Sequence, residues 1–348
     1  MATKDILESK DPSFLKIADL VVVTVTYGNR KHFILQMVES CQAQGVKRFV
    51  VVNNGAQWNI EELKNIYADL SFDIIDMGGN KGSAAGYAAG IETAINLGAE
   101  MVWLLDDDNR PKNDALRKLL NGYKCGLLEI LRDRIAVIGY RPESQGDEFM
   151  GIIHWRINPR YDSFRGFHIF DIPRRVKGYL PFKKSILKCS LPERIVIQEA
   201  PYSGLLFHRD LIKSIGLPNR NFVLYGDDFD FTYRITNIGG RIFFIRDALI
   251  DDLESLWYSR KRYGNGLSGM LRGGEDFRLY YGMRNATYFY STYRKRNALL
   301  FWINRSIYMG LLFLISIRYK KVRRYRLLCG AAREGLLGRL GESKRFPL

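Results

Sequence analysis

Three consecutive aspartates, Asp106, Asp107 and Asp108, form the densest cluster of side chains capable of chemistry in the sequence. They follow an apolar run at residues 101–105, which predicts a buried strand. Adjacent carboxylates repel one another, and a hard divalent cation with oxygen ligands removes that repulsion, particularly when it also bridges a diphosphate. A solvated acidic turn, or a helix start at 109–111, is the alternative explanation. The position after a buried strand favours the cation site.

A second acidic cluster, Asp227, Asp228 and Asp230, lies at the start of a helix predicted to end near residue 237. Carboxylates at a helix N-terminus are stabilised by the helix dipole, so ordinary capping is one explanation. A carboxylate that stays ionised beside a metal site could instead accept the proton of an acceptor hydroxyl. The sequence favours this second role, with Asp228 preferred to Asp227 as the base.

The glycine-rich segment 78–86 contains Asn80, Lys81 and Gly82 and precedes a helix of small residues. It matches neither the GxGxxG nor the GxxxxGK[ST] phosphate-binding pattern. Its small residues would let a ligand approach the backbone closely. Tight packing of the helix against a sheet explains the same composition equally well.

Strands and helices that could position these residues alternate along the first part of the chain. Apolar runs predict strands at 20–26, 49–55, 72–77 and 101–105, with helices at 32–44, 61–70 and 83–97 between them, and a later strand at 241–245. This alternation predicts an α/β fold with a mostly parallel sheet flanked by helices. Ligands of such sheets bind at the carboxyl ends of the strands, where Tyr27, Asn53 and Asp106 lie.

Composition excludes several classes of protein. Hydrophobic residues make up 47% of the chain and charged residues 26%, which indicates a globular protein with a sizeable core. The four cysteines are scattered without a CxxC pair, which argues against zinc fingers and disulfide frameworks. The polar N-terminal stretch predicts no secretory signal, and a cytoplasmic location is expected.

The net charge of +16 is concentrated in the last quarter of the chain. Residues 1–255 contain 33 basic and 33 acidic side chains, whereas residues 256–348 contain 20 basic and 4 acidic ones. This asymmetry indicates a polyanionic partner, either nucleic acid or an anionic membrane. Residues 299–317 are strongly apolar but include Arg305, which is costly inside a bilayer, and the basic run 318–326 follows. An interfacial or core helix is therefore favoured over a membrane span.

Taken together, these segments resemble family 2 glycosyltransferases of the GT-A fold. The matching motifs cover most of residues 20–290, and in chain order they are 21–27, 51–55, 79–87, 103–108, 226–230 with Tyr233 and Arg234, and Arg284 with Asn285. The Trp-Leu-Leu-Asp-Asp-Asp form at 103–108 is similar to bacterial galactofuranosyl- and rhamnosyltransferases that build O-antigen, capsule or galactan.

The resemblance implies an inverting transfer of a sugar from a UDP- or dTDP-linked donor to a hydroxyl of a growing glycan on a lipid carrier, with Mn²⁺ or Mg²⁺. It implies that Asp106 and Asp108 lie at the metal and diphosphate. Asp107 would face the donor sugar or its ribose, and Asp228 would be the general base. The residues expected to line the nucleotide are Thr26, Tyr27, Asn54, Asn80 and Gly82.

One position departs from the family pattern. Many relatives carry a metal-binding histidine shortly after the strand that matches 241–245, and here the matching position is Asp252. An aspartate also binds Mn²⁺ or Mg²⁺, although Asp251 and Asp252 could equally form a surface turn.

The resemblance and the charge distribution together divide the chain in two. Residues 1–255 are expected to form the GT-A catalytic domain. Residues 256–348 are expected to form a basic helical extension that attaches the protein to the inner face of the cell membrane. This extension could equally serve as a subunit interface in a homo-oligomer.

Two other classes of protein are compatible with part of the sequence pattern, namely with the acidic clusters, the basic C-terminus or the α/β alternation. A nucleic-acid-binding protein, or a metal-dependent nucleic-acid enzyme, would use the basic C-terminus and the acidic clusters. A nucleotidyltransferase that makes an activated sugar would share a nucleotide-binding α/β sheet. Residues 1–255 are electrically neutral and carry no recognised nucleic-acid motif. We therefore expect no nucleic-acid partner.

Overall fold

The computed structural model of the chain describes residues 16–145, 158–173, 194–254 and 266–348. These residues fall into two compact units, one formed by 16–145 with 194–254 and the other by 158–173 with 266–347. The sequence predicts a single domain over 1–255, whereas the structure groups 158–173 with the C-terminal helices. The reason is hydrogen bonding between segments that are distant in sequence. The Asp162 carboxylate accepts from the backbone N–H groups of Arg296 and Asn297.

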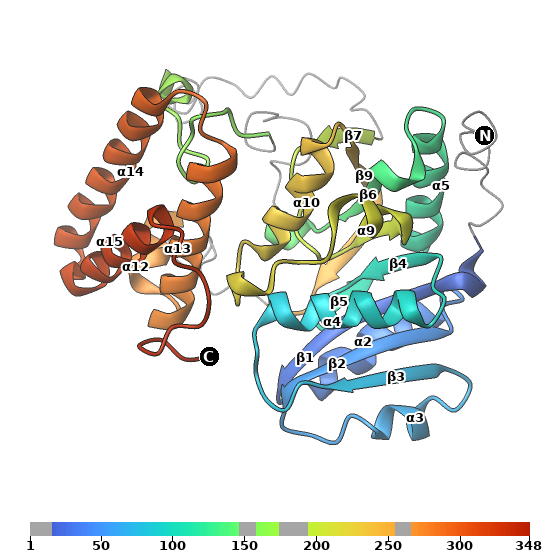
Figure 1. Ribbon diagram of the computed structural model, residues 1–348. Helices are drawn as coiled ribbons and strands as arrows, with labels where there is room; N and C mark the ends of the chain where they lie inside the picture. The colour runs from blue at the N-terminus through green and yellow to red at the C-terminus, as the bar shows by residue number, and fades with distance from the viewer. Residues whose placement is uncertain (1–15, 146–157, 174–193, 255–265) are drawn as a thin grey trace, which may run out of the picture. The chain divides into compact units, whose positions relative to one another are not determined.

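The first half of the sheet is parallel, in the order β3-β2-β1-β4 (Figure 1). Its strands are β1 (Leu20–Gly28), β2 (Arg48–Ala56), β3 (Ser71–Asp76) and β4 (Met101–Leu104). The intervening helices are α2 (Lys31–Gln42), α3 (Glu62–Ile66) and α4 (Ser83–Asn96). The apolar periodicity predicts all seven elements, and only α3 is markedly shorter than expected.

The second half of the sheet mixes directions. The strand β8 (Leu205–His208) lies antiparallel between β4 and β6 (Ile135–Tyr140), and β9 (Arg241–Asp252) runs parallel to β6. Two further strands, β5 (Asn109–Pro111) and β7 (Arg194–Ile197), pair antiparallel with β9. Six of the nine strands in this sheet point the same way, so the predicted mostly parallel sheet is confirmed. The predicted strand 241–245 continues to Asp252.

Further helices and 3-10 turns complete the first unit, and one 3-10 turn lies in the segment 158–173. The remaining helices of the first unit are α5 (Ala115–Leu127), α6 (Pro142–Gln145), α9 (Asp210–Ile215) and α10 (Asp227–Asn237). The 3-10 turns are η2 (Ile17–Asp19), η3 (Arg132–Arg134), η5 (Ile169–Asp171) and η6 (Arg220–Phe222).

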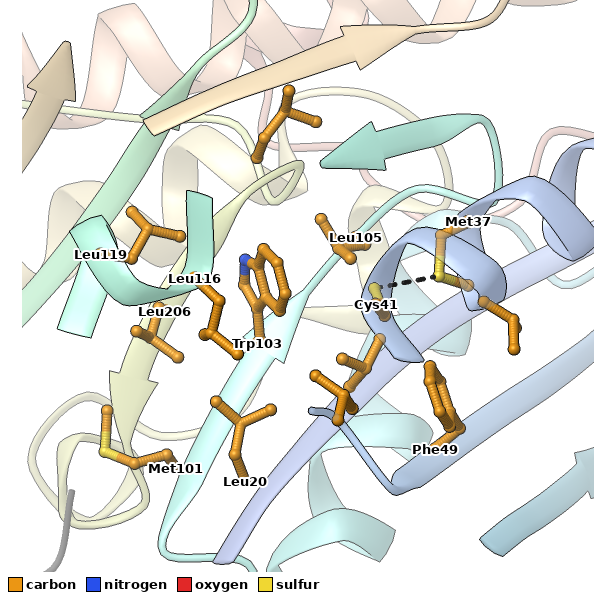
Figure 2. Packing of buried hydrophobic residues seen from close by; sticks show 14 of the residues in the cluster. Leu20, Met37, Cys41, Phe49, Met101, Trp103, Leu105, Leu116, Leu119 and Leu206 are labelled. Carbon is orange, nitrogen blue, oxygen red and sulfur yellow. Dashed lines mark hydrogen bonds between the residues drawn. The ribbon is translucent and has the colours of Figure 1, made fainter. Parts of the chain in front are cut away.

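Helices cover both faces of β1, which explains its continuous apolar sequence. Leu20 belongs to a buried cluster with Met37 and Cys41 of α2 (Figure 2). On the other face, α4 approaches so closely that a Cβ at Gly86 would lie 2.8 Å from Val25. Trp103 of β4 packs in the same cluster with leucines of α5 and β8 (Figure 2). This packing fixes the strand ends from which the acidic residues project.

The second unit is helical, as expected for a C-terminal extension. Its helices are α12 (Gly266–Arg272), α13 (Asp276–Tyr293), α14 (Ala298–Arg318) and α15 (Val322–Leu336). Helices α13 and α15 pack so closely that a Cβ at Gly335 would lie 2.1 Å from the Arg284 carbonyl oxygen. By length and composition α14 could cross a membrane, and 28% of its apolar window is buried. A core helix of a soluble protein meets the same two criteria, so the interfacial placement stays a prediction.

Candidate active site

Asp106 is held at the end of β4 by two hydroxyl groups. Its carboxylate accepts hydrogen bonds from the Tyr87 hydroxyl at 2.6 Å and from Ser203 Oγ at 2.7 Å. Its backbone N–H donates to Asn109 Oδ1 at 3.0 Å. Because Tyr87 belongs to α4, the helix that follows the glycine-rich loop is connected directly to this aspartate. One side chain therefore couples the two motifs that the sequence singled out.

Asp107 is buried, with 2% of its surface exposed, and is bound to residues that follow β1 or lie near its end. It accepts a hydrogen bond from Thr26 Oγ1 at 2.7 Å and two from Arg30 Nε at 2.9 Å. A second guanidinium nitrogen of Arg30 lies 2.9 Å from Asp107 Oδ1. Burial raises the pKa of Asp107, and the charge of Arg30 opposes this effect.

The contacts of Asp107 concern two of the expected site residues, Asp107 and Thr26. Thr26 and Arg30 donate to both oxygens of Asp107, and its predicted contact with the donor sugar or ribose stays a prediction. Thr26, expected to line the nucleotide, is itself buried by the same contact. Together with Arg30, which no sequence motif marks, these residues form a buried clamp that joins the ends of β1 and β4.

Asp108 and Asp252 come together because β5 pairs with β9. Asn109 is opposite Asp252 in the register, and the Leu253 N–H donates to the Asp108 carbonyl oxygen at 2.9 Å. Asp252 Oδ1 accepts from Arg141 at 3.0 Å and from Asn109 at 3.2 Å. The alternative of a surface turn does not hold for Asp252, because its side chain is 7% exposed.

The charges around Asp108 are those that a cation would neutralise. Burial raises the pKa of Asp108 to about 7, and the negative charges of three other aspartates, Asp106, Asp107 and Asp252, add to this rise. The positive charge of Arg30 lowers the pKa and so opposes the rise. Asp252 Oδ2 is buried and has no hydrogen-bond partner among the described residues.

Asp106, Asp108 and Asp252 offer the carboxylate oxygens that a hard divalent cation prefers, and Asp252 Oδ2 is an acceptor left unpaired by the residues that the structure describes. Within the described ranges, no group of three or more histidine, cysteine, aspartate or glutamate side chains is arranged as a ready-made metal site. The metal ligands therefore stay a prediction.

The second acidic cluster begins α10, where the sequence predicts a helix start. Asp227 is buried and accepts a hydrogen bond from Ser83 Oγ at 3.1 Å. Burial raises the pKa of Asp227 well above its ordinary range, and the charge of Asp228 adds to this effect. Ser83 is the first residue of α4, so the hydrogen bond joins the glycine-rich loop to α10.

Asp228, unlike Asp227, is only partly buried. Burial raises its pKa to about 7, and the charge of Asp106 contributes to this rise. The hydrogen bond from the Phe229 N–H and the charge of Arg141 lower it. The structure thus brings Asp228 within electrostatic reach of Asp106, although 122 residues separate them in the chain.

Asn54, Asn80 and Gly82 form one hydrogen-bonded network at the end of β2. Asn54 Nδ2 donates to Asn80 Oδ1 at 3.1 Å, and the Gly82 N–H donates to the same oxygen at 3.0 Å. Asn54 Oδ1 accepts from the Lys81 N–H at 2.8 Å. Asn54 is 3% exposed, and its hydrogen bonds hold the glycine-rich loop at residues 80–82 in place.

Tyr27, also expected to line the nucleotide, is partly exposed. The Arg30 guanidinium lies 5.0 Å from its ring centroid.

Gly82 occupies a position that only glycine fits. Its φ is +83°, and a Cβ added there would lie 2.0 Å from the Val223 carbonyl oxygen. The same carbonyl accepts a hydrogen bond from the Ala84 N–H at 3.2 Å. The glycine therefore allows α4 to begin against the segment that leads into α10.

Sequence reasoning missed the partners that position the aspartates. Arg30, Ser203 and Arg141 carry no motif by themselves. The available signals were the position of Arg30 shortly after β1 and that of Arg141 directly after β6. Ser203 gave no signal, because it reaches Asp106 only through the antiparallel placement of β8.

The fold and the site together define a class of protein. Carboxylates lie at the carboxyl end of β4, beside a glycine-rich loop that follows β3 and a partly exposed aspartate on α10. This is the arrangement of an α/β protein with a ligand site at the carboxyl edge of its parallel strands, where ligands of such sheets bind.

Comparison with known proteins shows a similarity to glycosyltransferases over part of the chain. Residues 21–179 match the sequence model of glycosyl transferase family 2, which is just under half of the chain. A curated relative, the galactofuranosyltransferase GlfT1 of Mycolicibacterium smegmatis, is 21% identical over 226 residues, which cover 64% of this chain and 67% of the relative. Residues 21–179 therefore match a family 2 glycosyltransferase domain. The mostly parallel, helix-flanked sheet of the first unit agrees with the expected GT-A fold.

Two solved structures resemble this chain more distantly. One is GalNAc-T7 with UDP, GalNAc and Mn²⁺, at 12% identity and a TM-score of 0.48, covering 68% of this chain and 43% of that one. The other is residues 1–349 of S. aureus TarS, at 14% identity and a TM-score of 0.41, covering 91% of each chain. Because both TM-scores are below 0.5, neither likeness bears on the function.

Proposed function

We propose that this glycosyltransferase moves a sugar, with galactofuranose or rhamnose favoured, from a UDP- or dTDP-linked donor to a hydroxyl of a growing cell-surface glycan on a lipid carrier. The observation that carries the proposal is that α4 joins the two acidic clusters, because its Tyr87 donates to Asp106 and its Ser83 donates to Asp227, the neighbour of Asp228. The similarity to a protein named as a galactofuranosyltransferase supports the choice of sugar.

In this proposal the residues divide the chemistry among them. Asp106, Asp108 and Asp252 would hold Mn²⁺ or Mg²⁺, which supplies positive charge to stabilise the departing diphosphate. Asp228 accepts the proton of the acceptor hydroxyl. The acceptor oxygen then forms its bond to the anomeric carbon as the bond from that carbon to the diphosphate breaks, so the configuration inverts. The Asp107–Arg30 clamp keeps the aspartate segment in place.

The products distinguish this reaction from that of a nucleotidyltransferase. We expect the purified protein, given UDP- or dTDP-galactofuranose or -rhamnose and a saccharide acceptor, to release nucleoside diphosphate and to lengthen the acceptor by one inverted linkage. Mass spectrometry and anomeric NMR of the product check this. Release of pyrophosphate from a nucleoside triphosphate would contradict the transferase assignment.

We further propose that the C-terminal unit attaches the protein to the inner face of the membrane. Helix α14 exposes large apolar side chains, among them Leu299 at 72%, Leu314 at 63% and Ile317 at 51%. The basic residues Arg318 and Lys320 follow at its end. An apolar helix face next to cationic side chains suits anionic lipid.

Vesicle binding tests this attachment. The full chain should co-sediment with vesicles that contain anionic lipid, and the bound fraction should fall as the salt concentration rises. Leu314→Gln should weaken binding, because it removes exposed apolar surface at little cost to folding. Binding that is equal on neutral and anionic vesicles, or unchanged in Leu314→Gln, would contradict the attachment. A homo-oligomer built on this face would instead show a concentration-dependent mass.

A further inference from the structure

A cleft of about 730 Å³ lies within the second unit, and none of its lining residues belongs to the candidate active site. It is lined by α13, α15 and the C-terminal segment 343–346. Its volume falls within the range of about 300–1,000 Å³ that is common for small-molecule sites. The cleft is therefore large enough for an organic ligand.

Three arginines give the cleft an unbalanced positive charge. Arg323, Arg326 and Arg345 line it, and none of them has an acidic partner within ion-pair distance in the described part of the chain. Of the two acidic residues that also line it, Asp276 forms an ion pair with Arg324, whereas Glu334 keeps its negative charge within the cleft. Asp276 accepts from Arg324 Nε at 2.9 Å, and Glu334 accepts from the Tyr280 hydroxyl. The three arginines are exposed to solvent, and the excess positive charge of the cleft favours an anionic ligand.

The cleft also has apolar lining residues. The rings of Tyr280 and Phe346 are stacked with centroids 4.6 Å apart, and Val322 and Leu327 also line the cleft. Guanidinium groups bind phosphate oxygens in a bidentate manner, and three of them match the charge of a diphosphate better than that of a single carboxylate.

We propose that this cleft binds a phosphate or diphosphate group, as a second anion site in addition to the donor site of the catalytic unit. The group would come either from a lipid phosphate, whose first carbons would contact the apolar lining residues, or from a free phosphate compound. Identifying the ligand with the carrier of the acceptor glycan rests on the proposed function, whereas the binding site itself does not.

Gly330 allows the cleft to be blocked without disturbing the fold. It lines the cleft within α15, and a Cβ added there would meet no heavy atom within 4 Å. Gly330→Phe therefore places a ring in open space, and phenylalanine has a higher helix propensity than glycine. The matched control is Gly310→Phe in α14, which also has open space around its Cβ and does not line the cleft.

The experiment is calorimetric titration of the full chain, in EDTA, with farnesyl diphosphate and separately with inorganic pyrophosphate. We expect the wild type to bind at least one of them. Gly330→Phe and Arg326→Ala should each weaken binding about tenfold, because an ionic hydrogen bond is lost or blocked. Gly310→Phe and Arg333→Ala, an exposed arginine of the same helix outside the cleft, should not change binding.

The two ligands separate the two sources of phosphate. Tighter binding of farnesyl diphosphate supports a lipid phosphate, and equal binding of pyrophosphate supports a free phosphate compound. Absence of binding by the wild type, or equal binding by Gly330→Phe and Arg326→Ala, would overturn the site. Binding of UDP with Mn²⁺ is measured on the same proteins, and its failure would contradict the donor site while leaving the result on the cleft in place.

Discussion

Asp228→Asn is expected to lower the rate of sugar transfer by about 10³-fold while leaving the affinity for the donor nucleotide unchanged. Asparagine is nearly isosteric with aspartate but cannot accept the proton of the acceptor hydroxyl. Asp228 is partly buried at the start of α10, so its replacement leaves the packing of that helix intact. Single-turnover transfer and equilibrium binding of UDP or dTDP measure the two quantities separately.

The pH dependence of the transfer rate, compared between the wild type and Asp228→Asn, gives a second test of Asp228 as the base. Burial and the charge of Asp106 raise the pKa of Asp228 to about 7, so a growing fraction of the base is protonated as the pH falls through that range. The wild-type rate should therefore decline toward acid pH, and a bound cation would move this decline to lower pH. The residual rate of Asp228→Asn should lack this decline. Loss of nucleotide binding together with turnover would contradict the assignment of Asp228 as the base.

Arg30→Met is expected to destabilise the catalytic unit by about 3 kcal/mol or more, because it leaves the buried carboxylate of Asp107 without a cation. The side chains of Arg30 and Asp107 are 11% and 3% exposed, and Arg30 also contacts Glu254 at 2.5 Å. A loss of this size corresponds to a fall in the melting temperature of about 6–12 °C. Thermal unfolding of the purified variant measures it.

The control for this prediction is an exposed ion pair in the same unit. Arg117 lies 3.0 Å from Asp114, three residues away on the surface, and Arg117→Met should leave the melting temperature unchanged. The double variant Arg30→Met with Asp107→Asn should recover part of the lost stability, since the unpaired charge is removed. Equal melting temperatures for Arg30→Met and the wild type would show that the clamp does not hold the ends of β1 and β4.

Much of the catalytic fold was predictable because its signals are local. The apolar runs of β1, β2 and β4 mark strands that are covered on both faces, as in parallel sheets. The start of α10 at Asp227 agrees with the acidic first turn. The motif at 103–108 indicates the family by its residues alone, because three adjacent aspartates after a buried strand have few structural explanations.

The contacts that position the aspartates depend on pairings between segments that are distant in sequence. Hydrophobic periodicity does not specify such pairings. The antiparallel insertion of β8 beside β4 brings Ser203 to Asp106, and the extension of β9 to Asp252 brings that residue opposite Asn109. The position of Arg30 shortly after β1 indicates that it lies near the strand ends, but it does not indicate that Arg30 pairs with Asp107.

The role expected of Asp107 at the donor sugar or ribose stays a prediction. A family pattern identifies a position without identifying its neighbours, and here the neighbours occupy the side chain. The metal ligands, the lipid acceptor and the membrane attachment stay predictions.

Thermal stabilisation by nucleotides tests the central claim most directly. A ligand that binds only the folded state at about 100 times its Kd adds about 2.7 kcal/mol of stability, which raises the melting temperature by several degrees. UDP, dTDP, GDP and CDP are compared with and without Mn²⁺, on the wild type and on Asp108→Ala. We predict a Mn²⁺-dependent rise with UDP or dTDP that is absent in Asp108→Ala. No rise with any nucleotide, in wild-type protein shown to be folded, would contradict the donor site.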